Sequence, residues 1–380
     1  MTEVGRVQTE QVKRGLTGVV ADTTSISMVD ADSNSLLYRG YPVEELAEQC
    51  SFEEVAYLLW YGELPTVAEL DAFQQAERGQ RRVSDSVMGH LADLPRNCHP
   101  MDVLRTAVSV LGAEDLGGEG LSVDVTRRRA LSIMAKLPSV VAFDQRRRRG
   151  GHAIEPDRGL SFAENFFDQC FGSVPEGRVV RCLERSLVLY AEHSFNASTF
   201  TARVITSTLS DVYSAVTGAI GALKGPLHGG ANEAVMAMLL EIGDPNDAEA
   251  WLAGALSQKR KIMGFGHRVY KHGDSRVPTM ERTLKEMADI SSASRMMELY
   301  VRLRDAMIRE KGIYPNLDYP SALAYYLMGF DVSMFTPMFV MSRITGWAAH
   351  VMEQVLENAL IRPLSLYIGS AQRSVPTGAR

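Results

Sequence analysis

The chain has 380 residues, a formal net charge of -6 with histidine counted as neutral, and 46% hydrophobic against 23% charged residues. This length suffices for two domains with sizeable cores, and the composition is that of a folded protein and not of a disordered one. The negative net charge argues against non-specific binding to nucleic acid. Local arginine clusters could still hold a small anion, so small anionic molecules are the expected partners.

The N-terminal segment 1–18 is polar and lacks the apolar stretch of a secretion signal. No later apolar run is long enough to span a bilayer. The four cysteines are far apart, with no C-x-x-C pair and no histidine spacing typical of a metal site: Cys50, Cys98, Cys170 and Cys182. We therefore expect reduced structural cysteines, no metal ion, no membrane partner and a cytoplasmic location.

Local signals predict a mostly helical chain that begins with a hairpin. Between residues 18 and 40, β-branched residues precede Asp32-Ser33-Asn34 and then Leu36-Leu37-Tyr38, which predicts a short hairpin and is the only convincing strand signal. Prolines at first-turn positions and capping boxes predict helix starts at Pro42, Ser51, Thr66 and Pro100. The glycine-rich segment 116–120, Pro138 and Pro175 predict loops between the helices that follow.

Four consecutive cations, Arg146–Arg149, end one of the predicted helices. Cations are stabilised by the negative end of a helix dipole, and such a run usually faces water. The alternative is a phosphate or carboxylate site, because guanidinium groups bind these anions through two parallel hydrogen bonds. The sequence leaves both interpretations open.

A histidine, His193, lies among small polar residues in segment 191–199. Few long apolar side chains surround it, which suits a pocket wall better than a core, although a satisfied structural histidine is equally compatible with the pattern. Segment 214–223 is rich in small residues at helical spacing. It predicts a helix that packs closely against its neighbours and leads rigidly into the next histidine.

Two glycine-rich loops each carry a histidine: 225–233 contains His228 and 264–271 contains His267. Glycine lets the backbone approach a ligand closely, so each histidine is expected beside open space. Apolar residues at helical spacing follow the first loop, which places His228 at a helix N-terminus. The positive end of that helix lowers an imidazole pKa and favours a neutral hydrogen-bond donor. One such histidine alone would be better explained as a helix cap, but the second loop reverses that preference.

Three charged residues complete the set of candidates. Arg276 follows the second histidine loop, and Asp318 lies in a loop between two prolines that restrict its backbone, although an N-cap is the commonest role of such an aspartate. Arg343 interrupts the long apolar run 337–361, which predicts a buried helix. A buried arginine needs a carboxylate or a ligand to meet its charge.

Loop histidines, a loop aspartate and several arginines suit the removal of a proton α to a carbonyl, followed by carbon–carbon bond formation. A carboxylate would take the proton, a neutral histidine would stabilise the enol oxygen, and a second histidine would polarise the attacked carbonyl. Arginines would hold a dicarboxylate or tricarboxylate. The chain has no P-loop, no dinucleotide fingerprint and no nucleophile elbow, which disfavours nucleotide-dependent and nucleophilic-hydrolase chemistry.

The sequence resembles the citrate synthase family, in particular its short bacterial branch of 2-methylcitrate synthases and citrate synthases that accept propionyl-CoA. The similarity extends from about Gly15 to Pro363 and includes segments 38–42, 99–102, 191–193, 315–318 and 345–350 besides the two histidine loops. It implies an all-α homodimer with a short N-terminal hairpin. Each subunit would have a large helical domain, 1–225 and 331–380, and a small mobile domain, 226–330, that binds coenzyme A and closes over oxaloacetate.

The resemblance also implies the catalytic roles. His228 would hold the thioester carbonyl as it enolises, Asp318 would remove the α-proton, and His267 would polarise the ketone of oxaloacetate. Family positions that bind oxaloacetate match His193, Arg276 and Arg343, while Arg362 matches an arginine delivered by the partner subunit. The segment lining the coenzyme A site matches Lys261, Ile262, Met263, Gly264 and Phe265, and Lys311 matches a position that can meet the coenzyme A phosphates.

The expected reaction condenses propionyl-CoA or acetyl-CoA with oxaloacetate and water, giving 2-methylcitrate or citrate and free coenzyme A. No permanently bound cofactor is implied. Because one methylene changes binding by only ~1–3 kcal/mol, use of both thioesters is physically reasonable. The reaction would belong to the methylcitrate cycle or to the tricarboxylic acid cycle. The alternatives are a dedicated citrate synthase, a citryl-CoA lyase and a non-catalytic helical binding module.

Overall fold

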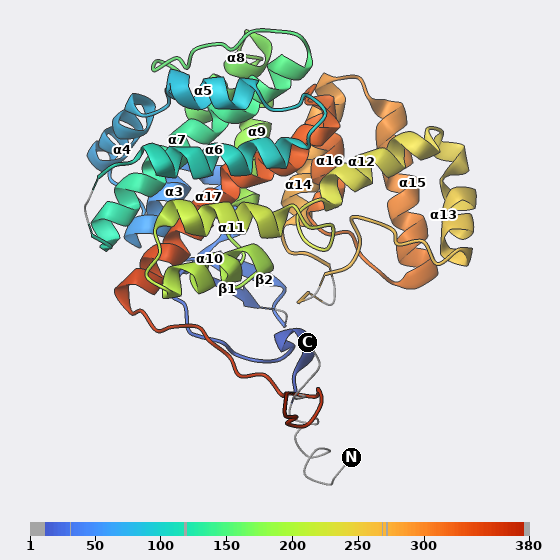
Figure 1. Cartoon of the computed structure of the whole chain (residues 1–380). Helices are drawn as coiled ribbons and strands as arrows, with labels where there is room; N and C mark the ends of the chain where they lie inside the picture. The colour runs from blue at the N-terminus through green and yellow to red at the C-terminus, as the bar shows by residue number, and fades with distance from the viewer. Residues whose placement is uncertain (1–11, 31, 118–119, 268, 271–272, 376–380) are drawn as a thin grey trace. The chain divides into compact units, whose positions relative to one another are not determined.

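The computed structural model describes residues 12–30, 32–117, 120–267, 269–270 and 273–375. Within these ranges it contains sixteen α-helices and one three-stranded sheet, which confirms the predicted mostly helical fold (Figure 1). The chain divides into two compact units, one formed by Met1–Thr23 with Leu360–Arg380 and the other by Thr24–Ala359. The first unit contains the short 3₁₀ helix η1 (Arg14–Leu16), and the second contains all the other elements.

The sheet is antiparallel, in the order β1 (Ser27–Asp30), β2 (Ser35–Tyr38) and β3 (Tyr41–Pro42). The β1–β2 pair confirms the predicted hairpin, with Ser27 opposite Tyr38. The first strand begins after the β-branched residues Val19 and Val20, which are exposed and lie in the other unit. β3 was not predicted, because two residues are too few to produce an alternating pattern.

Ten helices fill the first part of the large unit. They are α2 (Val43–Gln49), α3 (Phe52–Tyr61), α4 (Val67–Gly79), α5 (Asp85–Ala92), α6 (Pro100–Glu114), α7 (Val123–Arg148), α8 (Phe162–Phe171), α9 (Gly177–Tyr190), α10 (Ala197–Ser207) and α11 (Val212–Leu223). Both capping boxes are confirmed at Ser51 and Thr66. Pro100 opens α6 as predicted, whereas Pro42 precedes the first turn of α2 as its N-cap.

Pro138 lies inside α7, so the prediction of a loop there is wrong. A proline within a helix removes one hydrogen bond and crowds the preceding turn. The flanking residues Leu137, Val140 and Val141 are almost fully buried, and their burial offsets this cost. Of the predicted loop at 116–120, Gly118 and Glu119 lie outside the described residues.

The arginines that end α7 bind neighbouring segments of the chain. Arg147 is buried and donates to the carbonyl oxygen of Leu94 at 2.6 Å, while Arg149 pairs with Asp331 at 2.8 Å. Arg146 and Arg148 also donate to backbone carbonyls. Of the two interpretations left open, a run that faces water does not hold for Arg147, because carbonyl oxygens at the C-terminal end of α5 offer it partners.

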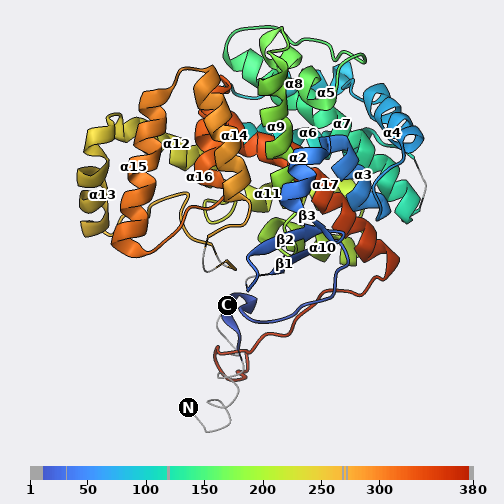
Figure 2. The same ribbon diagram turned by 180° about the vertical axis from the view of Figure 1, so that it is seen from behind.

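The remaining elements are α12 (Ala231–Ile242), η2 (Pro245–Asp247), α13 (Ala248–Ser257), α14 (Val277–Ile290), α15 (Ser294–Lys311), α16 (Asp318–Leu327), η3 (Val332–Met334) and α17 (Phe335–Leu356). Figures 1 and 2 both show α13 and α15 at one side of the large unit, with α14 and α16 between them and α17. α17 packs against α7, α10 and α3 and is buried along most of its length, which confirms the predicted core helix. A division of Thr24–Ala359 into a large and a small domain stays a prediction.

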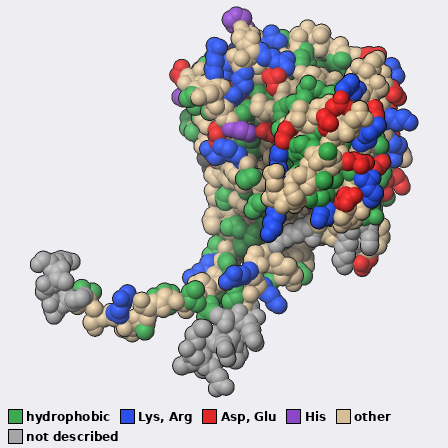
Figure 3. Space-filling view, turned by 90° about the vertical axis from the view of Figure 1, so that its right-hand side faces the viewer, with side chains coloured by type: hydrophobic (Ala, Val, Ile, Leu, Met, Phe, Trp, Pro, Cys, Tyr) green, Lys and Arg blue, Asp and Glu red, His purple; other side chains and the backbone are tan. Residues whose placement is uncertain are grey.

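The side formed by α13 and α15 is strongly charged, and Figure 3 shows cations and carboxylates intermingled over it. Arg260 pairs with Glu241 at 2.6 Å and Arg302 with Glu298 at 2.6 Å. Among the described residues, no helix is both long and apolar enough to cross a membrane.

Candidate active site

His228 lies in the loop between α11 and α12, three positions before α12 begins, as predicted. The small residues of α11 allow close packing against α10, because a Cβ added at Gly218 would lie 2.3 Å from the Cδ1 atom of Ile205. Gly229 brings the loop back onto α11, since a Cβ there would lie 2.5 Å from the carbonyl oxygen of Leu223. Both glycines therefore fix where the histidine stands relative to α10.

The proton of His228 is placed by α10. The backbone N–H of Ser198 donates to Nε2 of His228 at 3.2 Å, and the Ser198 hydroxyl lies 2.8 Å from the same nitrogen. Because a backbone N–H can only donate, Nε2 is an acceptor and the neutral ring carries its proton on Nδ1. Burial, with Arg343 adding to it, lowers the pKa of His228 to about 4. The ring is thus a neutral donor at pH 7, although burial and not the helix dipole is the main cause.

His267 has the opposite tautomer. Its Nδ1 accepts hydrogen bonds from the backbone N–H groups of Val269 and Tyr270, at 3.0 and 3.2 Å. The proton of the neutral ring therefore lies on Nε2. Burial lowers the pKa of His267 to about 4, assisted by Arg276 and opposed by Asp274. Arg268 and Lys271 of this loop lie outside the described residues.

His193 follows α9 and faces the second histidine loop, with its ring centroid 5.1 Å from that of His267. The side chain is buried, and within the described part of the chain its Nε2 has no hydrogen-bond partner. Burial, with Arg276 adding to it, holds the pKa of His193 well below its usual range. A buried ring nitrogen without a partner favours the pocket-wall interpretation over that of a satisfied structural histidine.

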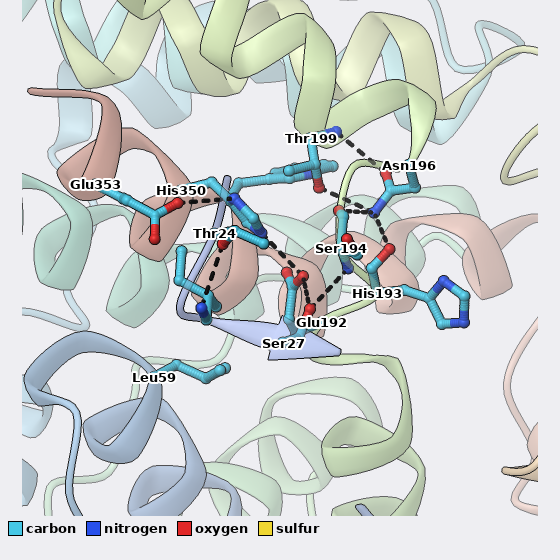
Figure 4. A network of polar contacts seen from close by, with 12 residues as sticks. Thr24, Ser27, Leu59, Glu192, His193, Ser194, Asn196, Thr199, His350 and Glu353 are labelled. Carbon is cyan, nitrogen blue, oxygen red and sulfur yellow. Dashed lines mark hydrogen bonds and ion pairs between the residues drawn. The ribbon is translucent and has the colours of Figure 1, made fainter. Parts of the chain in front are cut away.

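A buried network behind His193 holds its backbone in place. Oε1 of Glu192 accepts from His350 of α17 and from Ser27 of β1, each at 2.9 Å. The backbone N–H of Ser194 donates to the same serine at 3.0 Å. In Figure 4 the His193 ring points away from this network, so the sheet and α17 together fix the segment while the ring stays available.

Asp318 is the first residue of α16, and its carboxylate accepts a hydrogen bond from the Tyr190 hydroxyl at 2.7 Å. The N-cap position belongs to Leu317, so the N-cap interpretation of Asp318 is wrong. Burial raises the pKa of Asp318 to about 6, and the Tyr190 hydrogen bond opposes that rise. Such a carboxylate is ionised at neutral pH and more basic than an exposed one, as a general base requires.

Backbone hydrogen bonds join the Asp318 loop to the His267 loop. The N–H of Gly266 donates to the carbonyl oxygen of Tyr314 at 2.8 Å, and the N–H of Asn316 donates to that of Gly264 at 2.9 Å. The Asn316 side chain then donates to the carbonyl oxygen of Gly266 at 3.0 Å and accepts from the N–H of Asp318 at 3.1 Å. The candidate base and the second histidine are therefore placed by one backbone assembly.

Two buried guanidinium groups lie in this region. Arg276 donates to both carboxylate oxygens of Asp274, at 2.9 and 2.7 Å. Arg343 donates from Nε to the carbonyl oxygen of Tyr190 at 2.6 Å and lies over the ring of Phe339. Burial lowers the pKa of Arg343 to about 10, so it stays charged at neutral pH. It forms no ion pair with a described carboxylate, which favours a role in binding an anion.

The sequence similarity of the chain identifies its family. Residues 15–364 match the model described as citrate synthase, C-terminal domain. The chain belongs to the citrate synthase family. It is 60% identical over 365 residues to the 2-methylcitrate synthase of Mycobacterium tuberculosis, covering 96% of this chain and 92% of that one. It is 58% identical over 375 residues to the citrate synthase of Mycolicibacterium smegmatis, covering 99% and 100%.

Solved structures of citrate synthases share the fold. The citrate synthase of Thermotoga maritima has a TM-score of 0.87 at 40% identity, covering 97% of this chain and 99% of that one. The Thermoplasma acidophilum citrate synthase in a ternary complex with carboxymethyl coenzyme A and oxaloacetate has a TM-score of 0.90 at 34% identity, covering 97% and 99%. The predicted family resemblance is confirmed.

Segment 261–265, which was predicted to line a coenzyme A site, lies beside the Asp318 loop. Phe265 forms an isolated bridge with Pro315, and its ring packs on Tyr319 with centroids 4.5 Å apart. Gly264 has φ +82°, and a Cβ there would lie 2.5 Å from Val235. The rest of the segment comprises exposed Lys261, buried Ile262 and half-buried Met263. Lys311, the last residue of α15, is exposed.

Arg362 belongs to the smaller compact unit, and its delivery to a partner's site stays a prediction.

The contacts of Asp274, Tyr190 and Ser198 were not predicted. A signal existed for Asp274, since an aspartate two positions before a buried arginine is well placed to pair with it. None existed for Tyr190, whose place at the end of an apolar helix is typical of a core residue.

Proposed function

We propose that the chain condenses propionyl-CoA or acetyl-CoA with oxaloacetate and water, giving 2-methylcitrate or citrate and free coenzyme A. The observation that carries the proposal is the combination of a carboxylate whose pKa is raised to about 6 with two neutral histidines of opposite tautomer. Membership of the citrate synthase family and the names of its close relatives support the same reaction.

The first step would be enolisation of the thioester. The Asp318 carboxylate takes a proton from the carbon α to the thioester carbonyl, and the carbonyl oxygen accepts a hydrogen bond from Nδ1–H of His228. A neutral donor suits this role, because it stabilises the developing oxyanion without first having to lose a full charge. The carboxylate becomes a carboxylic acid, and the thioester becomes its enol or enolate.

The second step would form the carbon–carbon bond. The enol carbon attacks the ketone carbon of oxaloacetate, whose oxygen accepts a hydrogen bond and then a proton from Nε2–H of His267. His193, Arg276 and Arg343 would hold the carboxylates of oxaloacetate. Asp274 already fixes the orientation of Arg276 through two hydrogen bonds, so the Arg276 side chain loses little conformational freedom when substrate binds. Water then cleaves the thioester and releases coenzyme A.

Coenzyme A would lie along segment 261–265, with Lys311 meeting its phosphates. Domain 226–330 would close over oxaloacetate against the rest of the subunit, with the reaction taking place in the cytoplasm. Arg362 would reach the active site of the partner in a homodimer. The segment that carries it has the exposed apolar side chains Leu364, Tyr367 and Ile368, a composition suited to burial against another subunit.

The test is the release of free thiol by the purified protein. With oxaloacetate present, thiol release from propionyl-CoA or acetyl-CoA is expected, and none is expected without oxaloacetate. The ratio of kcat/KM for the two thioesters distinguishes a 2-methylcitrate synthase from a dedicated citrate synthase. If neither thioester releases coenzyme A while oxaloacetate still binds in calorimetry, the protein is a binding module and the proposal fails.

A further inference from the structure

We propose that Tyr190 is a positioning residue of the reaction, which orients the Asp318 carboxylate through its hydroxyl and ties it to Arg343 through its backbone. The inference rests on the proposed function, in which Asp318 is the base and Arg343 binds oxaloacetate. Tyr190 itself touches neither substrate in this scheme. It acts by fixing two groups that do.

The hydroxyl of Tyr190 selects which oxygen of Asp318 is free. Tyr190 is the last residue of α9, is only 2% exposed, and reaches Oδ1 of Asp318 at 2.7 Å. Oδ2 of Asp318 accepts no hydrogen bond from the described residues, and the aspartate is not fully buried. With Oδ1 occupied, Oδ2 remains as the oxygen that can receive a proton. The rotation of the carboxylate is thereby restricted before any substrate binds.

The backbone of Tyr190 reaches the second group. Its carbonyl oxygen accepts the 2.6 Å hydrogen bond from Nε of Arg343. Its ring packs against Phe339 with centroids 4.4 Å apart, and the Arg343 guanidinium lies over the same Phe339 ring, 4.7 Å from its centroid. One residue thus contacts the base, the anion-binding arginine and the aromatic ring that supports it. A shift of Tyr190 would change the distance between base and bound oxaloacetate.

The hydrogen bond also has an electrostatic effect with a defined sign. Burial raises the pKa of Tyr190 far above its usual range, so this hydroxyl stays protonated and donates. A hydrogen bond donated to a carboxylate stabilises its ionised form and lowers its pKa. This bond is the largest contribution opposing the effect of burial on Asp318. Without it the pKa of Asp318 would rise further, and less of the base would be ionised at neutral pH.

Tyr325 provides a matched control. It lies in α16, is fully buried, and donates its hydroxyl to Ser186 of α9 at 3.1 Å. Tyr325→Phe therefore removes a buried tyrosine hydroxyl between the same two helices without removing the hydrogen bond to Asp318. Any loss of stability common to both variants is then the cost of a missing buried hydrogen bond, and any difference in pH dependence is specific to Tyr190.

The experiment compares pH profiles of kcat/KM and of kcat for the wild type, Tyr190→Phe and Tyr325→Phe. In Tyr190→Phe we expect the acid limb to move up by roughly one pH unit, since a hydrogen bond to a charged group contributes about that much to a pKa. We also expect kcat on the plateau to fall by about tenfold, with a larger isotope effect from α-deuterated thioester, because proton transfer becomes slower. KM for oxaloacetate should change little, and Tyr325→Phe should keep the wild-type profile.

A second variant covers the case in which Tyr190→Phe does not fold. Replacing Tyr190 alone by a ring-difluorinated tyrosine keeps the shape and makes the phenol more acidic, hence a stronger donor. The acid limb should then move down, opposite to the direction in Tyr190→Phe. An acid limb unchanged in both variants, or moved equally by Tyr325→Phe, would overturn the inference. A wild-type protein that releases no coenzyme A would instead overturn the proposed function, so the two failures are distinguishable.

Discussion

At the residue scale, the tautomers of the two loop histidines are fixed in the same way. In each ring a nitrogen accepts a hydrogen bond from a backbone N–H, of Ser198 for His228 and of Val269 for His267. A backbone amide cannot reverse its role, so the proton of the neutral ring is confined to the other nitrogen. Burial lowers both pKa values to about 4, which keeps both rings neutral in the range where Asp318 ionises.

Asp318→Asn tests the balance between activity and stability. The variant should lose activity by about 10²–10⁴-fold, since a positioned general base contributes that much. Its stability should behave differently. The pKa of Asp318 in the folded protein, about 6, lies above the ordinary 3.8, so protonation of Asp318 favours the folded state. This contribution to stability is fully present below pH 3.8 and is lost as the pH rises through 6. At pH 7 this loss amounts to about 3 kcal/mol, and asparagine avoids it because it does not ionise.

The measurement is thermal unfolding of both proteins between pH 4 and pH 8. The Tm of Asp318→Asn should exceed that of the wild type by a few degrees at pH 7, and the difference should shrink towards pH 4. Equal Tm differences at all pH values would contradict the raised pKa. An inactive variant that is also unfolded would show that Asp318 is structural.

The sequence was informative about which residues are candidates for the chemistry and not about what holds them. His228, His267 and Asp318 could be proposed because glycine-rich loops and flanking prolines are local patterns. The hydrogen bond between Tyr190 and Asp318 joins positions far apart in the chain, and no local pattern encodes such a pair. The sequence left two interpretations of the run 146–149 open for the same reason, because the partners of Arg147 and Arg149 come from distant segments.

At the scale of elements, the contact between α17 and the segment that carries His193 depends on one glycine. The N–H of Gly346 donates to the carbonyl oxygen of Ala191 at 3.2 Å. A Cβ on Gly346 would lie 2.5 Å from that oxygen and 2.2 Å from the Glu192 carboxylate. α17 therefore approaches the segment as closely as a backbone can, and any side chain at this position would push them apart.

Gly346→Ala should lower stability by about 1–3 kcal/mol, as overpacking in a core does, and should weaken oxaloacetate binding by displacing His193. Gly254→Ala in α13 is the matched control, because a Cβ there meets no atom within 4 Å. It should raise stability by roughly 0.5–1 kcal/mol, since alanine is the better helix former, and leave binding unchanged. Melting curves and calorimetric titration with oxaloacetate measure both effects; a Gly346→Ala variant as stable as the wild type would refute the packing argument.

Element boundaries could be predicted where the signal was local. The capping boxes at Ser51 and Thr66 and the first-turn Pro100 were all confirmed, because caps involve residues three or four positions apart. Pro138 was wrongly assigned to a loop, since its tolerance within α7 depends on the burial of its flanking residues, and α7 packs against α17 and α8, which are distant in the sequence. Tertiary packing overrides local preference in such cases.

At the scale of the whole molecule, the proposed action of Arg362 in the partner's active site can be tested with a mixture of two inactive variants. In a dimer of one Asp318→Asn chain and one Arg362→Ala chain, action in the partner leaves one complete active site. Action within the same subunit leaves none. Random exchange should then restore about a quarter of the wild-type activity, because half of the dimers are mixed and each has one working site.

The exchange is measured by unfolding the two variants together, refolding them and assaying thiol release. Each variant refolded alone is the control and should stay inactive. If the mixture shows only the sum of the two separate activities, Arg362 does not complete a partner's site, or the protein does not form dimers; sedimentation analysis of the same sample separates these outcomes.

The backbone N–H groups that fix the tautomers of His228 and His267 affect how such a site can evolve. Side chains around the acyl group can be exchanged without moving a proton between ring nitrogens, because no side chain determines the tautomer. Selection on the thioester can therefore act separately from selection on the acid–base groups. Relatives named 2-methylcitrate synthase and citrate synthase, at 60% and 58% identity, are what such independence would produce.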